Sequence, residues 1–152
     1  MRATWLAAGA VVIVAACGGG EKPAAMDSTA AAPAAAAPAA TGTVHEVQMA
    51  QVGADYRFVP ETITIKVGDQ VKFTNMANMA HNVQFYSDSI PAGAAAVLDA
   101  NMPNKMGPLA ANLLTAQGET YTISFAGAPT GTYKYTCLPH MATGMKGTII
   151  VQ

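Results

Sequence analysis

The segment from Cys137 to Met145 gathers three side chains that bind soft metal ions: the thiol of Cys137, the imidazole of His140 and the thioether of Met145. A further donor has to come from elsewhere in the chain, and His81 can supply it. The third histidine, His45, is predicted to be an ordinary surface residue. Two imidazoles and a thiolate with a weak thioether suit copper, which cycles between Cu(I) and Cu(II). The sequence therefore predicts a site for one copper ion.

Two predicted strands hold this loop in place. The run Thr132–Cys137 is rich in strand-forming residues, and the run Thr148–Val151 follows the loop. Between them, Pro139 has a fixed φ and no N–H, which stiffens the turn. Gly144 gives the chain the freedom to reverse its direction. One loop between two strand ends thus carries three of the four predicted donors.

Short runs with alternating apolar and polar residues, separated by turn residues, predict an all-β fold. The predicted strands are Val44–Met49, Thr62–Val67, Val71–Thr74, His81–Tyr86, Tyr121–Phe125, Thr132–Cys137 and Thr148–Val151. This pattern is typical of an antiparallel β-sandwich. The segment Ala94–Thr115 departs from it, being rich in Ala, Leu, Asn and Met, and predicts one short helix near Leu109–Leu114.

Residues 1–16 have the pattern of an export signal. Arg2 supplies a positive charge, and an apolar run follows that is shorter than the roughly 20 residues a membrane span needs. The sequence Val14–Cys17 resembles the lipobox of bacterial lipoproteins, which predicts cleavage before Cys17 and a lipid on its thiol. The alternative is an ordinary secretory signal cut nearby, with Cys17 incidental.

Residues 17–43 are predicted to be a tether, because they are rich in Ala and Pro and show no apolar periodicity. The folded domain is predicted over residues 44–152. This organisation predicts a protein on the periplasmic side of the cell envelope, anchored by lipid at Cys17; the alternative is a soluble periplasmic protein. Cys17 lies at the signal boundary and Cys137 lies among metal donors, so no disulfide is expected.

The charge balance of the folded part is close to neutral. Residues 44–152 contain six Lys and Arg residues against seven Asp and Glu residues. No basic patch indicates a nucleic-acid partner, and long-range electrostatic steering of a protein partner should be weak. The length suffices for one hydrophobic core and not for two, and we expect a monomer.

The folded part resembles plastocyanin and its bacterial relatives such as auracyanin, in the cupredoxin family. Beyond the loop, the resemblance rests on Phe58–Pro60, Ile63–Gly68, Ala80–Val83, Asp88–Gly93 and Gly118–Thr120, which occur in the family's order. It implies a Greek-key β-sandwich. It also implies one copper ion, with the ligands His81, Cys137, His140 and Met145.

The resemblance assigns roles to neighbouring residues as well. The backbone N–H of Asn82 is expected to donate to the sulfur of Cys137, a contact that shifts the copper potential. Met145 keeps the family's interval of four residues between the histidine and the axial methionine, whereas Met141 is expected to face outward. An apolar surface over the metal is expected from Met79, Leu138 and Met141.

Three residues depart from the family's pattern. Ala80 stands where a proline usually precedes the first histidine ligand. Thr136 stands where a tyrosine usually precedes the cysteine, so the family's remote electron route is not expected here. Tyr56 replaces a small apolar surface residue near the metal end, which is expected to alter the choice of partner.

Together these features predict a one-electron carrier, not an enzyme, that serves membrane-associated redox proteins. The resemblance implies that the electron leaves through the imidazole of His140. The alternative is a protein that stores or delivers Cu(I) with the help of the additional methionines. A structural zinc site is a weaker alternative, because zinc has little use for the thioether of Met145.

Overall fold

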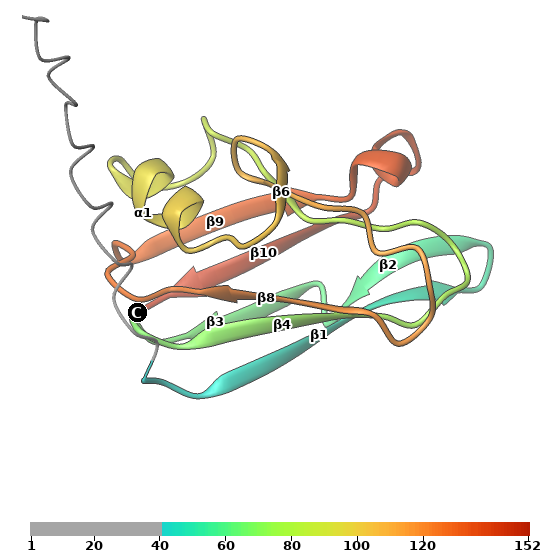
Figure 1. Cartoon of the computed structure of the whole chain (residues 1–152), viewed down its shortest axis with the longest axis horizontal. Coiled ribbons are helices and arrows are strands. Elements are labelled where there is room, and N and C mark those ends of the chain that lie inside the picture. The colour runs from blue at the N-terminus through green and yellow to red at the C-terminus, as the bar shows by residue number, and fades with distance from the viewer. Residues whose placement is uncertain (1–40) are drawn as a thin grey trace, which may run out of the picture. The chain divides into compact units, whose positions relative to one another are not determined.

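The computed structural model describes residues 41–152, which fold into two β-sheets packed face to face (Figure 1). Within this part of the chain, one sheet has the strand order β2-β1-β4-β8 and the other the order β3-β10-β9-β5-β7-β6. The strands are β1 Val44–Val52, β2 Asp55–Val59, β3 Thr62–Ile65, β4 Gln70–Asn75, β5 Gln84–Phe85, β6 Lys105–Gly107, β7 Ala110–Ala111, β8 Thr120–Ser124, β9 Gly131–Thr136 and β10 Lys146–Val151. The predicted all-β sandwich is confirmed. The predicted signal peptide, Cys17 and nearly all of the predicted tether lie outside the described residues.

The core between the sheets is built from every second residue of the strands. β4 and β10 bury alternate side chains, as the two-residue period of a strand requires. The rings of Phe58, Phe73 and Phe85 surround the ring of Tyr135, with centroids 4.7, 5.5 and 5.7 Å away. Burying each such side chain contributes about 1.5–3 kcal/mol. Because Tyr135 is two residues before Cys137, this cluster anchors the strand end that carries the thiol.

Two strand pairs are parallel, so the prediction of an antiparallel sandwich is wrong for them. β1 pairs with β4 and β3 pairs with β10 in parallel registers. The cause is the connection between the sheets: the chain leaves the first sheet after β2, forms β3 in the second, and returns as β4 beside β1. Alternation in a sequence reports which side chains are buried, and it carries no information on the direction of the neighbouring strand.

The helix predicted near Leu109–Leu114 is misplaced. The α-helix within residues 41–152 is α1, Ala94–Ala100, which begins after Gly93 and buries Ala94 and Leu98 on one face. Pro108 and Leu109 form a turn instead, with Leu109 at a φ of 55°, and the backbone after them pairs with residues 81–84. Ala111 donates to the carbonyl of Val83 at 2.9 Å, and Leu114 exchanges two backbone hydrogen bonds with His81.

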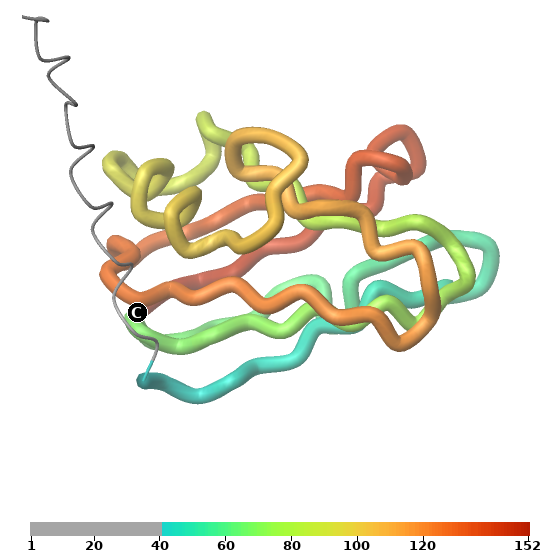
Figure 2. Tube along the Cα trace, viewed as in Figure 1, coloured from blue at the N-terminus to red at the C-terminus, as the bar shows by residue number. Residues whose placement is uncertain are grey.

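A short 3-10 helix, η1 (Leu138–Thr143), lies between β9 and β10 and contains Pro139 in its first turn. Figure 2 shows this loop at the end of the sandwich away from the C-terminus, and β2 contacts it. Because η1 contains His140 and directly follows Cys137, this end of the sandwich carries the predicted loop donors.

Among residues 41–152, no helix has the length and apolar character needed to cross a membrane.

Candidate metal centre

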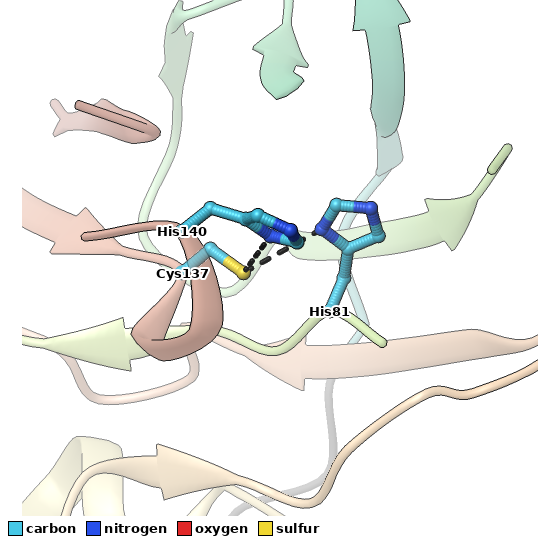
Figure 3. A group of neighbouring side chains, drawn as sticks. All are labelled: His81, Cys137 and His140. Carbon is cyan, nitrogen blue, oxygen red and sulfur yellow. Dashed lines mark hydrogen bonds between the residues drawn. The ribbon is translucent and has the colours of Figure 1, made fainter. Parts of the chain in front are cut away.

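His81, Cys137 and His140 converge on one point at the loop end of the sandwich (Figure 3). The Cys137 Sγ lies 3.5 Å from Nδ1 of His81 and 3.5 Å from Nδ1 of His140. The three donor atoms lie within 4.8 Å of one another, and all three residues are buried. Three of the four predicted donors are thus brought together from two distant parts of the chain.

Backbone hydrogen bonds hold each of these side chains. The N–H of His81 donates to the carbonyl of Leu114 at 3.0 Å, and the N–H of Leu114 donates back at 2.8 Å. The N–H of His140 donates to the carbonyl of Cys137 at 3.1 Å, which closes the first turn of η1. Gly144 then takes a φ of 81°, a left-handed conformation that favours glycine, and reverses the chain into β10.

Met145 is fully buried at the start of this return. Its carbonyl accepts the N–H of Cys137 at 3.1 Å and the hydroxyl of Thr136 at 2.8 Å, and its N–H donates to His140 at 3.1 Å. These bonds fix the backbone of Met145 against both loop donors. Its role as the axial ligand stays a prediction.

Asn82 connects the two segments that carry the donors. Its side-chain carbonyl accepts the N–H of Leu138 at 2.8 Å, and its amide donates to the carbonyl of Ala111 at 3.3 Å. Burial raises the pKa of the Cys137 thiol, while hydrogen bonds from the backbone N–H groups of Asn82 and His140 to the sulfur lower it. Burial outweighs these two hydrogen bonds, so the pKa of the thiol lies above its ordinary value.

Both imidazoles are neutral at neutral pH. Burial, together with the nearby His140, lowers the pKa of His81 to about 4. Burial also lowers the pKa of His140. A neutral imidazole keeps a free lone pair on one ring nitrogen, which is the form that binds a metal ion.

The spacing of the donors fits a single metal ion. Metal–sulfur and metal–nitrogen bonds of about 2.3 and 2.0 Å, meeting at a near-tetrahedral angle, separate sulfur from nitrogen by roughly 3.5 Å. Both Sγ–Nδ1 distances at Cys137 have this value. One thiolate and two imidazoles are the in-plane donors of a blue-copper site.

Tyr56 of β2 covers this centre, a relationship that the sequence analysis missed. Its ring centroid lies 4.4 Å from that of His140 and 5.1 Å from that of His81. His140 is consequently only 8% exposed. The three residues predicted to form an apolar surface are all exposed; they are Met79, Leu138 and Met141. The identity of Tyr56 was the signal for this contact, because a tyrosine ring reaches further than the small apolar residue that it replaces.

His45 lies away from the donors, as predicted, but it is only partly exposed. Its Nε2 is 2.9 Å from a carboxylate oxygen of Asp69. That carboxylate also accepts the backbone N–H groups of Lys66 and Thr43, each at 2.9 Å. The Lys66 N–H and then His45 lower the pKa of Asp69. His45 therefore helps to fix the start of β1.

A β-sandwich that presents buried Cys, His and His donors from one loop and from the segment before β5 defines a blue-copper protein of the cupredoxin class. The model of a protein family described as copper binding proteins, plastocyanin/azurin family, matches residues 45–152. The chain belongs to this family.

Individual relatives agree with the family match. The chain is 41% identical to the chloroplastic plastocyanin of Chlamydomonas reinhardtii over 117 residues, which covers 75% of this chain and 73% of the relative. It is 36% identical to the plastocyanin of Ginkgo biloba over 106 residues, which covers 70% of this chain and 98% of that relative. The oxidised plastocyanin of Dryopteris crassirhizoma superposes with a TM-score of 0.55 at 28% identity, covering 71% of this chain and 100% of that one.

The predicted resemblance to plastocyanin is therefore confirmed. Proteins of this family carry electrons and are not enzymes. The chain is accordingly a blue copper electron carrier with a site for one copper ion at His81, Cys137 and His140.

Proposed function

We propose that the protein carries single electrons between membrane-associated redox proteins, with Met145 as the weak axial ligand of its copper. The observation that supports this proposal most directly is the pair of equal 3.5 Å distances from the Cys137 Sγ to the two imidazole nitrogens. When bound, copper supplies the chemistry by taking up and releasing one electron. The protein supplies a fixed arrangement of donors.

The donors have little freedom to move. His81 and Cys137 are fully buried, and the aromatic core supports the strand that ends at Cys137. The bond between Asn82 and Leu138 joins the His81 segment to the loop. A frame that is held in this way keeps nearly the same geometry in both oxidation states, so little reorganisation accompanies electron transfer.

The proposed location rests on the sequence pattern of residues 1–43. Export through residues 1–16 and a lipid on Cys17 would keep the domain at a membrane on the periplasmic side. Fractionation of cells that express the full chain tests this. The unchanged protein should sediment with membranes, and Cys17→Ser should appear in the soluble fraction. An unchanged distribution would contradict the anchor.

The proposed partners make apolar contact with the protein. The folded part is close to neutral, and Met79, Leu138 and Met141 are exposed at or near the centre. Contact through uncharged side chains gives association rates that depend little on salt. A steep loss of electron-transfer rate with rising ionic strength would count against this mode of docking.

Cu(I) storage or delivery is the second candidate function, because several methionines are exposed. They are Met76, Met79, Met106 and Met141. The two functions differ in how tightly copper is held. The copper-loaded protein is reduced, reoxidised through several cycles in the presence of a Cu(I)-selective chelator, and then freed of small molecules. An electron carrier regains its full colour, whereas a delivery protein loses its copper to the chelator.

A further inference from the structure

The imidazole of His140 is poorly accessible to a partner. In the proposed function an electron leaves through this ring, yet His140 is only 8% exposed. The ring of Tyr56 lies across it, 4.4 Å away between centroids with the planes tilted by 40°. Aromatic pairs at this separation are in van der Waals contact. A protein that approaches this side of the centre therefore meets the ring of Tyr56 before it meets the imidazole.

Tyr56 contacts both histidine donors and not one alone. Its ring also stands edge-on to the ring of His81, with centroids 5.1 Å apart and the planes at 68°. The two imidazoles are themselves 4.6 Å apart. One aromatic side chain is thus packed against both nitrogen ligands of the predicted copper.

Part of Tyr56 is open to solvent. Tyr56 is only partly buried, and it lines a cavity of about 640 Å³ together with Met76 and Met79. The other side chains around this cavity are neutral, and four of them carry amides: Gln48, Gln51, Asn78 and Gln117. Neither imidazole lines the cavity. Within the described structure, the ring of Tyr56 lines the cavity and also contacts both imidazoles.

We propose that the ring of Tyr56 is the contact through which electrons pass between the copper centre and a docked protein. The inference rests on the proposed electron-carrier function. Electron transfer slows steeply as the gap between donor and acceptor widens. A ring in contact with both imidazoles and with a solvent-open neutral cavity bridges a gap that would otherwise be filled by water.

Electron exchange between copies of the protein itself tests this without a known partner. Samples of the copper-loaded full chain in the Cu(I) and Cu(II) forms are mixed, and the self-exchange rate is taken from NMR line broadening. Tyr56→Phe keeps the ring and should keep the rate of the unchanged protein. Tyr56→Leu removes the ring and should lower the rate about tenfold, which corresponds to a barrier higher by about 1.4 kcal/mol.

The matched control is Met76→Leu, which changes an exposed neighbour on the same cavity and leaves the ring in place. This variant should exchange electrons at the unchanged rate. The visible absorption and reduction potential of all three variants should equal those of the unchanged protein, because none of them alters a copper ligand. In the metal-free protein, the ring-current shift on the His140 ring protons should persist in Tyr56→Phe and disappear in Tyr56→Leu.

Three results would overturn the inference. Tyr56→Leu exchanging as fast as the unchanged protein would mean that His140 passes the electron directly. Tyr56→Leu losing its colour would assign the ring to copper retention instead. An equal loss of rate in Met76→Leu would assign the effect to the surface as a whole. The proposed function fails separately, if the unchanged protein binds no blue copper or exchanges no electrons.

Discussion

The side-chain carbonyl of Asn82 accepts the backbone N–H of Leu138 at 2.8 Å, and this bond joins two segments that are far apart in the sequence. Asn82 directly follows the donor His81, and Leu138 directly follows the donor Cys137. Asn82 is itself fully buried. The relative position of the two donors therefore depends on one side-chain amide that binds no metal.

Asn82→Ala should destabilise the metal-free protein by about 2 kcal/mol, because it leaves the Leu138 N–H and the Ala111 carbonyl without their partner. Urea unfolding of both proteins measures the difference. Asn78→Ala is the control, since Asn78 is exposed, and it should change stability by less than about 0.5 kcal/mol. An equal change in the free energy of unfolding for the two substitutions would contradict the structural role of Asn82.

Met145→Leu should leave copper bound and raise its reduction potential, because the weak axial ligand tunes the potential and a leucine cannot ligate. A redox titration that follows the visible absorption measures the shift. Met141→Leu, at an exposed position of the same loop, should leave the potential unchanged. A potential that stays the same or falls in Met145→Leu would contradict the axial role.

Tyr135→Phe should stabilise the protein or leave its stability unchanged. The hydroxyl of Tyr135 is buried and has no hydrogen-bond partner in the described structure, so removing it removes an uncompensated polar group. Tyr133→Phe is the matched control, because the Tyr133 hydroxyl donates to the carbonyl of Pro129 at 2.6 Å. This control should lose about 1 kcal/mol of stability in urea unfolding. Comparable losses in both variants would show that the Tyr135 hydroxyl has a partner.

The hydrogen bonds that the Asp69 carboxylate accepts, from the backbone N–H of Lys66 and then from His45, predict a loss of stability in acid. The pKa of Asp69 is lowered in the folded chain from its ordinary value of 3.8. Its contribution is therefore fully present above pH 3.8 and disappears as the pH falls through the lowered pKa. Urea unfolding of the metal-free protein and of Asp69→Asn across this range should show a difference that shrinks as the pH falls. A difference that is constant with pH would contradict this role of the Asp69 carboxylate.

The donors and the sandwich were predictable from the sequence because both depend on local patterns. Cys137, His140 and Met145 share one loop, and the alternation in β4 and β10 reports a buried face directly. The parallel pairs were not predictable in this way, since strand direction depends on where the chain crosses between sheets.

The position of the helix and the contact made by Tyr56 could not be predicted from the sequence, because both depend on tertiary structure. The segment around Leu109 has helix-forming residues, but Leu109 has a φ of 55° and the residues after it pair with residues 81–84. Strands β5, β6 and β7 have only two or three residues each, too few to show a period. Tyr56 was expected to be a surface residue that alters the choice of partner. Its packing on the two imidazoles could not be predicted, because it depends on β2 lying beside the loop.

His81, Cys137 and His140 are expected to hold one copper ion, with the thiolate of Cys137 as the donor that gives the blue colour. The visible and EPR spectra of the Cu(II)-loaded protein test it most directly, with Cys137→Ser as the control. The unchanged protein should bind one copper per chain, absorb strongly in the blue-copper band and show narrow hyperfine splitting, and Cys137→Ser should be colourless. A colourless unchanged protein, or a variant that stays blue, would contradict the account.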